Sequence, residues 1–178
     1  SSPVLQSALV AGLTSAGARV LDAGVFPTGG VSLLCHELGA AGGVMISASH
    51  NAASDNGIKL FGAGGSKLSE GFERRLESRI AEMATNPEEE PLDGSSEPLL
   101  AASEIYERRL LAASGLKPGD LRGLRLVVDC AHGSAYQLTP AILRKLGATV
   151  RTIGVEPDGR NINAGCGATA PQALVDAV

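Results

Sequence analysis

The most constraining feature of this sequence is an internal repeat, in which residues 11–29 and 141–159 share one order of small, apolar and turn-forming residues. Nine of these nineteen positions are identical, including three glycines and a proline. Each copy predicts a helix that ends at a glycine, Gly17 or Gly147, and then a strand and a proline-containing turn. Either shared ancestry or convergence of two helix–strand units explains the match. In both cases the repeat predicts an α/β protein with two halves of similar local structure, and shared ancestry would make them related domains.

The periodicity of apolar residues predicts the other elements of both halves. The helices are expected over residues 3–16, 31–38, 70–83, 104–113 and 137–146. The strands are expected over residues 19–25, 43–48, 58–61, 124–128 and 149–155.

A change of composition separates the two halves. Residues 85–98 hold three prolines, three consecutive glutamates and a Gly-Ser-Ser run, which predicts a solvated linker. We therefore expect a first domain over residues 1–92 and a second over residues 99–178. A helical pattern is already under way at the first residues and another is cut short at the last ones. The first domain is thus expected to lack its N-terminal part and the second to stop before its C-terminus.

Charge, hydropathy and cysteine spacing exclude several classes of protein. The net charge of −4 argues against a nucleic-acid binder that neutralises phosphates. No apolar run approaches the roughly 20 residues of a membrane span. Cys35, Cys130 and Cys166 are odd in number and widely spaced, so they predict neither a disulfide framework nor a zinc site. We interpret them as buried thiols in a reducing cytoplasm.

The chemistry-bearing residues gather after the predicted strand 43–48. The apolar run ends abruptly in Ser49, His50 and Asn51, and Lys59 follows ten residues after the serine. Catalytic loops tend to lie at such carboxyl ends of strands. A hydroxyl with nearby proton carriers suits nucleophilic or phosphoryl-carrying chemistry. The residues around Ser49 do not form the G-x-S-x-G pattern of a hydrolase.

The segment from residue 43 to residue 51 closely resembles the phosphoserine loop of the α-D-phosphohexomutases. Residues 55–59 and 65–68 are most similar to the bacterial phosphoglucosamine mutases within that family, and residues 157–167 resemble their second-domain loop, to which we assign no catalytic role. The resemblance implies two related three-layer α/β domains of the phosphohexomutase type. One departure is Ala52, where the family usually has proline, which loosens a turn that should be rigid.

The resemblance also implies a role for each candidate residue. Ser49 would be phosphorylated, pass its phosphoryl group to a sugar phosphate and take the other one back from a 1,6-bisphosphate intermediate. Lys59 would help to move the proton on the sugar hydroxyl. His50 and Asn51 would shape the loop and hydrogen-bond the phosphate.

A single Mg²⁺ in each active site is implied as the cofactor, held by the phosphoryl group on Ser49. The family's aspartate ligands belong to an Asp-rich loop that this sequence does not contain, so they are expected beyond residue 178. Asp129 and His132 could be read as metal ligands, but two residues are too few for a site. We expect the 178-residue chain alone to be inactive.

Together these implications describe a bacterial, cytoplasmic isomerase of carbohydrate metabolism and a phosphoprotein. It would interconvert glucosamine 6-phosphate and glucosamine 1-phosphate, a step toward UDP-N-acetylglucosamine. Its partner would be a small-molecule sugar phosphate, with no nucleic acid and no membrane, and a homodimer stays open. Two alternatives remain: a phosphohexomutase that acts on mannose or glucose phosphates, or an inactive fragment that retains the fold.

Overall fold

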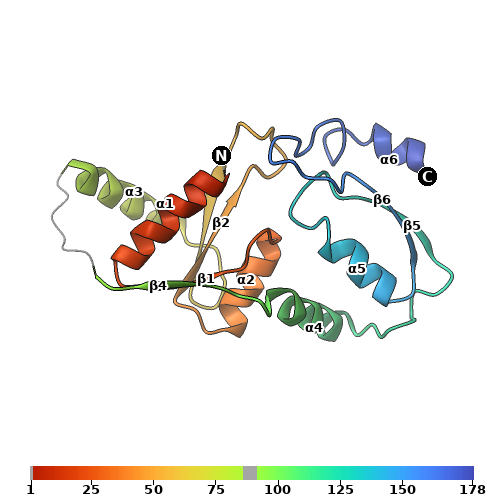
Figure 1. Cartoon of the computed structure of the whole chain (residues 1–178), viewed down its shortest axis with the longest axis horizontal. Coiled ribbons are helices and arrows are strands. Elements are labelled where there is room, and N and C mark those ends of the chain that lie inside the picture. The colour runs from red at the N-terminus through yellow and green to blue at the C-terminus, as the bar shows by residue number, and fades with distance from the viewer. Residues whose placement is uncertain (1, 86–91) are drawn as a thin grey trace.

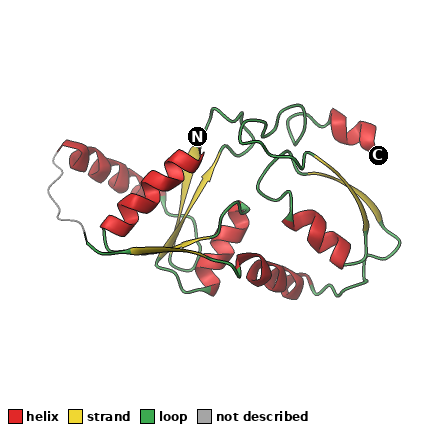
Figure 2. Ribbon diagram, viewed as in Figure 1, coloured by secondary structure: helices red, strands yellow, loops and turns green. Residues whose placement is uncertain are grey.

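The computed structural model describes residues 2–85 and 92–178, in which helices and strands alternate (Figures 1 and 2). The helices are α1 (Ser2–Ser15), α2 (Thr28–Glu37), α3 (Glu70–Thr85), α4 (Ala102–Ser114), α5 (Leu138–Lys145) and α6 (Gln172–Ala177). The strands are β1 (Arg19–Asp22), β2 (Gly42–Ser47), β3 (Gly57–Gly62), β4 (Ser95–Pro98), β5 (Arg125–Asp129) and β6 (Thr149–Ile153). The predicted α/β class is confirmed, and the predicted elements are present with ends displaced by a few residues.

In the part of the chain that the structure describes, the strands pair two by two. β1 and β4 run parallel, β2 and β3 form an antiparallel hairpin, and β5 and β6 run parallel with α5 between them in the chain. α2 packs on β2, α1 contacts both β1 and β2, α5 packs on β6, and α6 contacts β5. Figure 1 shows the first half at the left and the second half at the right, with α4 beside α2 between them.

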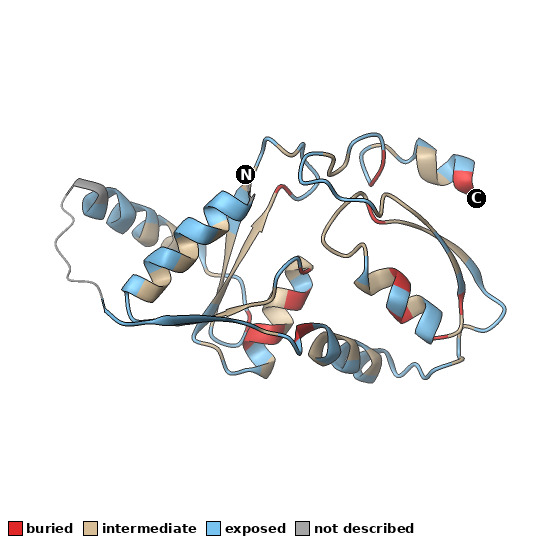
Figure 3. Cartoon of the chain, in the orientation of Figure 1, coloured by how far each residue is buried: buried red, intermediate tan, exposed pale blue. Residues whose placement is uncertain are grey.

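A small apolar cluster joins the two halves. Phe26 and Leu34 pack with Ala102, which is the first residue of α4. Tyr106 meets the ring of Phe26 edge-on, with ring centroids 5.5 Å apart, and Leu138 of α5 lies against the same cluster. Other buried apolar residues, among them Ile142, Leu146 and Ala148 in and after α5, lie outside this cluster (Figure 3). Because burial of one large apolar side chain contributes about 1.5–3 kcal/mol, this cluster holds α2 and α4 together.

The internal repeat has the same local geometry in both copies. Gly17 follows α1 with a φ of 81°, and Gly147 follows α5 with a φ of 102°. Each glycine N–H donates to the carbonyl three residues earlier at 2.9 Å. The N–H of the next alanine donates to the carbonyl five residues earlier, at 3.0 Å in the first copy and 3.1 Å in the second. Both helices therefore end in a Schellman motif before a parallel strand.

The predicted linker over residues 85–98 needs a correction. Residues 86–91 lie outside the described residues, but Ser95–Pro98 forms β4 and pairs with β1. The prediction of a wholly irregular segment is therefore wrong for its last four residues, although all four are exposed as expected of a solvated stretch. The domain boundaries at residues 92 and 99 stay predictions.

Contacts with β1 and α1 explain why β4 forms. The guanidinium Nε of Arg19 donates to a carboxylate oxygen of Glu97 at 2.8 Å across the strand pair. Gly94 enters β4 where a Cβ would lie 2.4 Å from the carbonyl oxygens of Thr14 and Ala18. Glutamate and proline are depleted in strands, so the composition of residues 95–98 does not predict β4. The strand forms because these residues pair with β1.

The turn after β3 offers a matched test of backbone packing. Gly65 has a φ of 80° and is buried, and a Cβ there would lie 2.0 Å from the carbonyl oxygen of Ser32. Gly64 has a φ of 82°, but a Cβ there would meet nothing within 4 Å. We expect Gly65→Ala to lower the free energy of unfolding by about 2–4 kcal/mol, through left-handed strain plus overpacking. Gly64→Ala should cost about 1–2 kcal/mol, because only the strain remains.

Urea denaturation of the two variants measures the difference. Equal losses in both variants would contradict the close approach of the Gly65 and Ser32 backbones.

Candidate active site

The Ser49 loop, residues 48–56, connects the two strands of the β2–β3 hairpin. Ala48 is buried, whereas Ser49, His50 and Asn51 are exposed. The ladder ends at the pair of Ser47 and Gly57, so the exposed hydroxyl lies just past the last paired residue of β2. The predicted strand-to-loop arrangement is confirmed, and the roles of the loop residues stay predictions.

The backbone of Ser49 adopts an uncommon conformation. Its φ is 58°, in the left-handed region where a residue other than glycine stores roughly 1–3 kcal/mol of strain. Two local hydrogen bonds support it. The N–H of Ser49 donates to the hydroxyl oxygen of Ser47 at 2.9 Å, and the N–H of Asn51 donates to the carbonyl of Ala48 at 3.0 Å. A strained serine on an exposed, hydrogen-bonded turn is typical of a functional position.

The register of the hairpin relates Lys59 to the serine. Lys59 lies opposite Met45 in the antiparallel ladder, and Ser47 is the next residue of β2 on the same face. Diagonal neighbours of this kind have Cα atoms roughly 7–8 Å apart, within reach of a long side chain. Lys59 is half-buried. The hairpin therefore places Lys59 one diagonal step from Ser47, the second residue before Ser49.

Sequence reasoning missed one residue that contacts this loop. Asn163 belongs to the segment between β6 and α6, residues 154–171, which we call the Asn163 loop. Its side-chain Nδ2 donates to the main-chain carbonyl of Ser49 at 3.0 Å and to that of Asn51 at 2.8 Å. Figure 1 shows the loop after β6 reaching the loop after β2. No local pattern signals a contact across 112 and 114 residues.

Asp129, at the end of β5, organises the base of the Asn163 loop. One carboxylate oxygen accepts the N–H of Ala131 at 2.8 Å, and the other accepts the N–H of Gly167 at 2.6 Å. Nearby, Nδ1 of His132 accepts the N–H of Glu156 at 3.1 Å. Both side chains that resembled a partial metal site are thus engaged with backbone N–H groups.

The described residues hold no group of three or more His, Cys, Asp or Glu side chains that could bind a metal ion. Ser49 fits a Mg²⁺ site only as a single oxygen donor once it carries a phosphoryl group, because Mg²⁺ prefers six oxygen ligands. A complete site would need carboxylates from outside the described residues.

The three cysteines are free and buried, as the sequence predicted. Burial raises the pKa of the thiols of Cys130 and Cys166, and the negative charge of Asp129 raises the pKa of both further. Because only the thiolate is a strong nucleophile, these residues are unsuited to catalysis.

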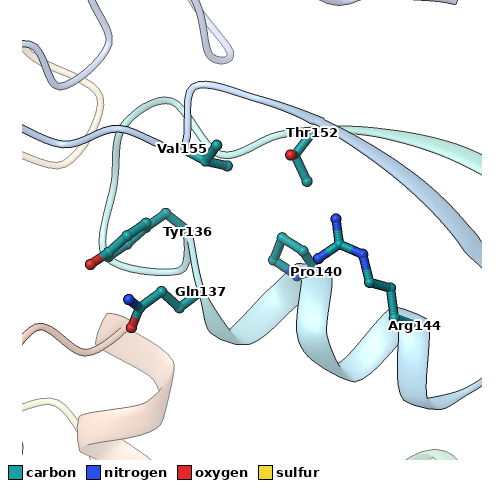
Figure 4. A pocket seen from close by; sticks show the side chains of 6 residues that line it. All are labelled: Tyr136, Gln137, Pro140, Arg144, Thr152 and Val155. Atoms are coloured by element: carbon teal, nitrogen blue, oxygen red, sulfur yellow. The ribbon is translucent and has the colours of Figure 1, made fainter.

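Two hollows in the described surface lie away from the Ser49 loop. One is shallow and formed by side chains of α5, the residues just before it and the β6 region (Figure 4): Tyr136, Gln137, Pro140, Arg144, Thr152 and Val155. Another lies between Phe26 and the start of α5. Neither is lined by Ser49, Lys59 or Asn163. Ser49, His50 and Asn51 are exposed on the surface of their loop.

The fold is α/β, and its candidate site consists of an exposed, strained serine after β2 and a lysine on the paired strand β3. The family model for phosphoglucomutase/phosphomannomutase, alpha/beta/alpha domain I, matches residues 1–87. The chain is 48% identical over its whole length to phosphoglucosamine mutases of Symbiobacterium thermophilum and Rhodococcus opacus. The chain belongs to the α-D-phosphohexomutase family.

The comparisons also define how much of such a protein is present. The chain spans 39% of the Symbiobacterium thermophilum relative and 40% of the Rhodococcus opacus one. A crystal structure of a phosphoglucomutase/phosphomannomutase family protein from Burkholderia thailandensis superposes with a TM-score of 0.72 at 27% identity, covering 88% of this chain and 34% of that one. No described helix is long and apolar enough to cross a membrane.

Proposed function

We propose that this chain is the phosphoserine-bearing part of an enzyme that interconverts glucosamine 6-phosphate and glucosamine 1-phosphate. The observation that carries the proposal is the Ser49 loop, in which an exposed hydroxyl is held in a left-handed turn with Lys59 on the paired strand. Identity of 48% with phosphoglucosamine mutases over the full chain supports the choice of the amino sugar. The alternative, mannose or glucose phosphates, has weaker support at 27% identity.

The proposed reaction moves phosphoryl groups in two balanced steps. The bond between the Ser49 oxygen and phosphorus breaks as the O1 hydroxyl of glucosamine 6-phosphate forms a bond to that phosphorus and loses its proton, and the Ser49 oxygen takes up a proton. Glucosamine 1,6-bisphosphate results. The Ser49 hydroxyl then gives up its proton and takes the phosphoryl group from O6, the O6 oxygen gains a proton, and glucosamine 1-phosphate leaves. Such transfer depends on positioning and charge neutralisation more than on covalent chemistry.

The neighbouring residues have distinct roles in this proposal. Lys59 carries or steers the proton of the sugar hydroxyl, since it lies on the hairpin face next to Ser47. His50 and Asn51 expose their side chains beside Ser49 and can hydrogen-bond the phosphoryl oxygens. Bound Mg²⁺ would neutralise charge on the transferred group. Ser49 would hold it through the phosphoryl oxygen.

The proposal also covers the cellular location of the enzyme, its domain boundaries and its metabolic role. We place the enzyme in the cytoplasm, where a reducing environment suits three buried free thiols. We assign residues 1–92 and 99–178 to two related domains, supported by the matching helix ends at Gly17 and Gly147. A role toward UDP-N-acetylglucosamine is part of the proposal, which leaves the choice between a monomer and a homodimer open.

A substrate panel tests the proposed function in the full-length enzyme that carries this chain. We expect kcat/KM for glucosamine 6-phosphate to exceed that for mannose 6-phosphate and glucose 6-phosphate by about tenfold or more, and EDTA to abolish turnover. A preference for mannose or glucose phosphate would replace the amino-sugar assignment. Absence of turnover with all three sugars would favour an inactive protein that retains the fold.

A further inference from the structure

We propose that Asn163 is a positioning residue for the phosphoryl-carrying serine, acting through the main-chain carbonyls of Ser49 and Asn51. The proposal rests on the function proposed above and assigns to the Asn163 loop a role within it. The loop contributes no reacting group of its own. It holds the Ser49 loop, from the other half of the chain, in the geometry that transfer requires.

The contact matches the chemistry of an amide. The NH₂ group of asparagine has two N–H donors, and Asn163 directs its Nδ2 to two acceptors at 3.0 and 2.8 Å. The two carbonyls flank His50, so the contact spans the tip of the turn. Only main-chain atoms are used, which leaves the side chains of Ser49, His50 and Asn51 exposed for a substrate.

The backbone at position 163 also favours asparagine. Its φ is 60°, and asparagine adopts the left-handed region more readily than most residues. The N–H of Asn163 donates to the carbonyl of Ala131 at 2.9 Å. A Cβ on Gly167 would lie 3.2 Å from the amide oxygen of Asn163 and 2.8 Å from Cβ of Ala131. The backbone of Asn163 is therefore held by Ala131, and Gly167 leaves room for the Asn163 side chain.

Hydrogen bonds attach the Asn163 loop to the end of strand β5. Asp129 ends β5, and its two carboxylate oxygens accept the N–H groups of Ala131 and Gly167. Ala131 in turn accepts the N–H of Asn163. A continuous series of hydrogen bonds therefore leads from the β5–β6 ladder to the carbonyl of Ser49. Sites supported by a strand are held more accurately than sites supported by loops alone.

The functional consequence follows from the strain at Ser49. A left-handed serine persists only when its surroundings hold it, and the local support comes from Ser47 and Ala48. Asn163 adds two donors from the second half. Without them the turn can relax, and a misplacement of about 1 Å at a reacting atom can cost about 100-fold in rate.

The test uses Asn163→Gly in the full-length enzyme, because glycine keeps the left-handed backbone and removes both donors. We expect kcat to fall about 10- to 100-fold with KM changed less than about twofold. Hydrogen–deuterium exchange should accelerate about tenfold or more at the amides of Ser49 and Asn51, with the melting temperature of the protein little changed. Asn163→Gln, which keeps the NH₂ group on a longer side chain, should recover part of the kcat.

The matched control is Asn161→Gly in the same loop. The Nδ2 of Asn161 donates to the carbonyl of Glu156 at 2.8 Å, and its bonds stay within the Asn163 loop. We expect kcat and exchange at Ser49 to stay near wild type. Equal effects of both variants, or unchanged exchange in Asn163→Gly, would overturn the proposal. The exchange measurement needs no turnover, so it decides on Asn163 even if the proposed activity fails.

Discussion

Ser49→Ala is expected to lower mutase turnover in the full-length enzyme by about three orders of magnitude or more. Alanine removes the oxygen that carries the phosphoryl group, and no neighbouring group in the Ser49 loop replaces it at the same place. The fold should be retained, because the Ser49 side chain is exposed and the supporting bond from its N–H to Ser47 uses the backbone. Intact-protein mass spectrometry should show loss of one phosphoryl group.

The control for this substitution is Ser54→Ala. Ser54 is an exposed serine of the same loop whose hydroxyl donates to the carboxylate of Asp55 at 3.3 Å. We expect turnover and the phosphorylated mass to stay at wild-type levels. A Ser49→Ala enzyme with wild-type turnover, or a phosphoryl group that persists in it, would move the carrier to another residue.

Lys59→Met is expected to cut kcat by about two to four orders of magnitude, the usual weight of a positioned acid or base. Methionine has a similar length and apolar stem but neither charge nor donor, so the β2–β3 ladder should be unaffected. The register places Lys59 beside Met45 and diagonal to Ser47, the second residue before Ser49. Steady-state kinetics of kcat and KM separate this role from simple binding.

Lys67→Met serves as the comparison. Lys67 is an exposed lysine whose Nζ lies 3.6 Å from a carboxylate oxygen of Glu73, a residue of α3. Its removal should leave kcat within about twofold, because exposed ion pairs contribute at most about 1 kcal/mol. If Lys59→Met instead raises KM with kcat unchanged, Lys59 binds the substrate uniformly and the assignment to proton transfer is wrong.

Local features of the candidate site follow from neighbouring residues and were predictable. The apolar residues of β2, the small residues after it and the glycine at the start of β3 predict two strands with a serine-bearing loop between them, and the structure pairs these strands as a hairpin. The spacing of Lys59 from Ser49 places both on that hairpin. The left-handed φ of Ser49 was not predictable, because serine has no intrinsic preference for it. The contacts of Ser47 and Asn163 with the turn select that conformation.

The sequence by itself determined the α/β class, the paired helix–glycine–strand units and the position of the serine, because each depends on residues that are close neighbours in the sequence. Tertiary structure alone decided β4 and the Asn163 contact. β4 forms because β1, some 76 residues earlier, offers a parallel partner. Asn163 reaches Ser49 because the β5–β6 ladder and the Asp129 carboxylate carry its loop there. Such contacts depend on how distant segments pack, which no periodicity along the chain encodes.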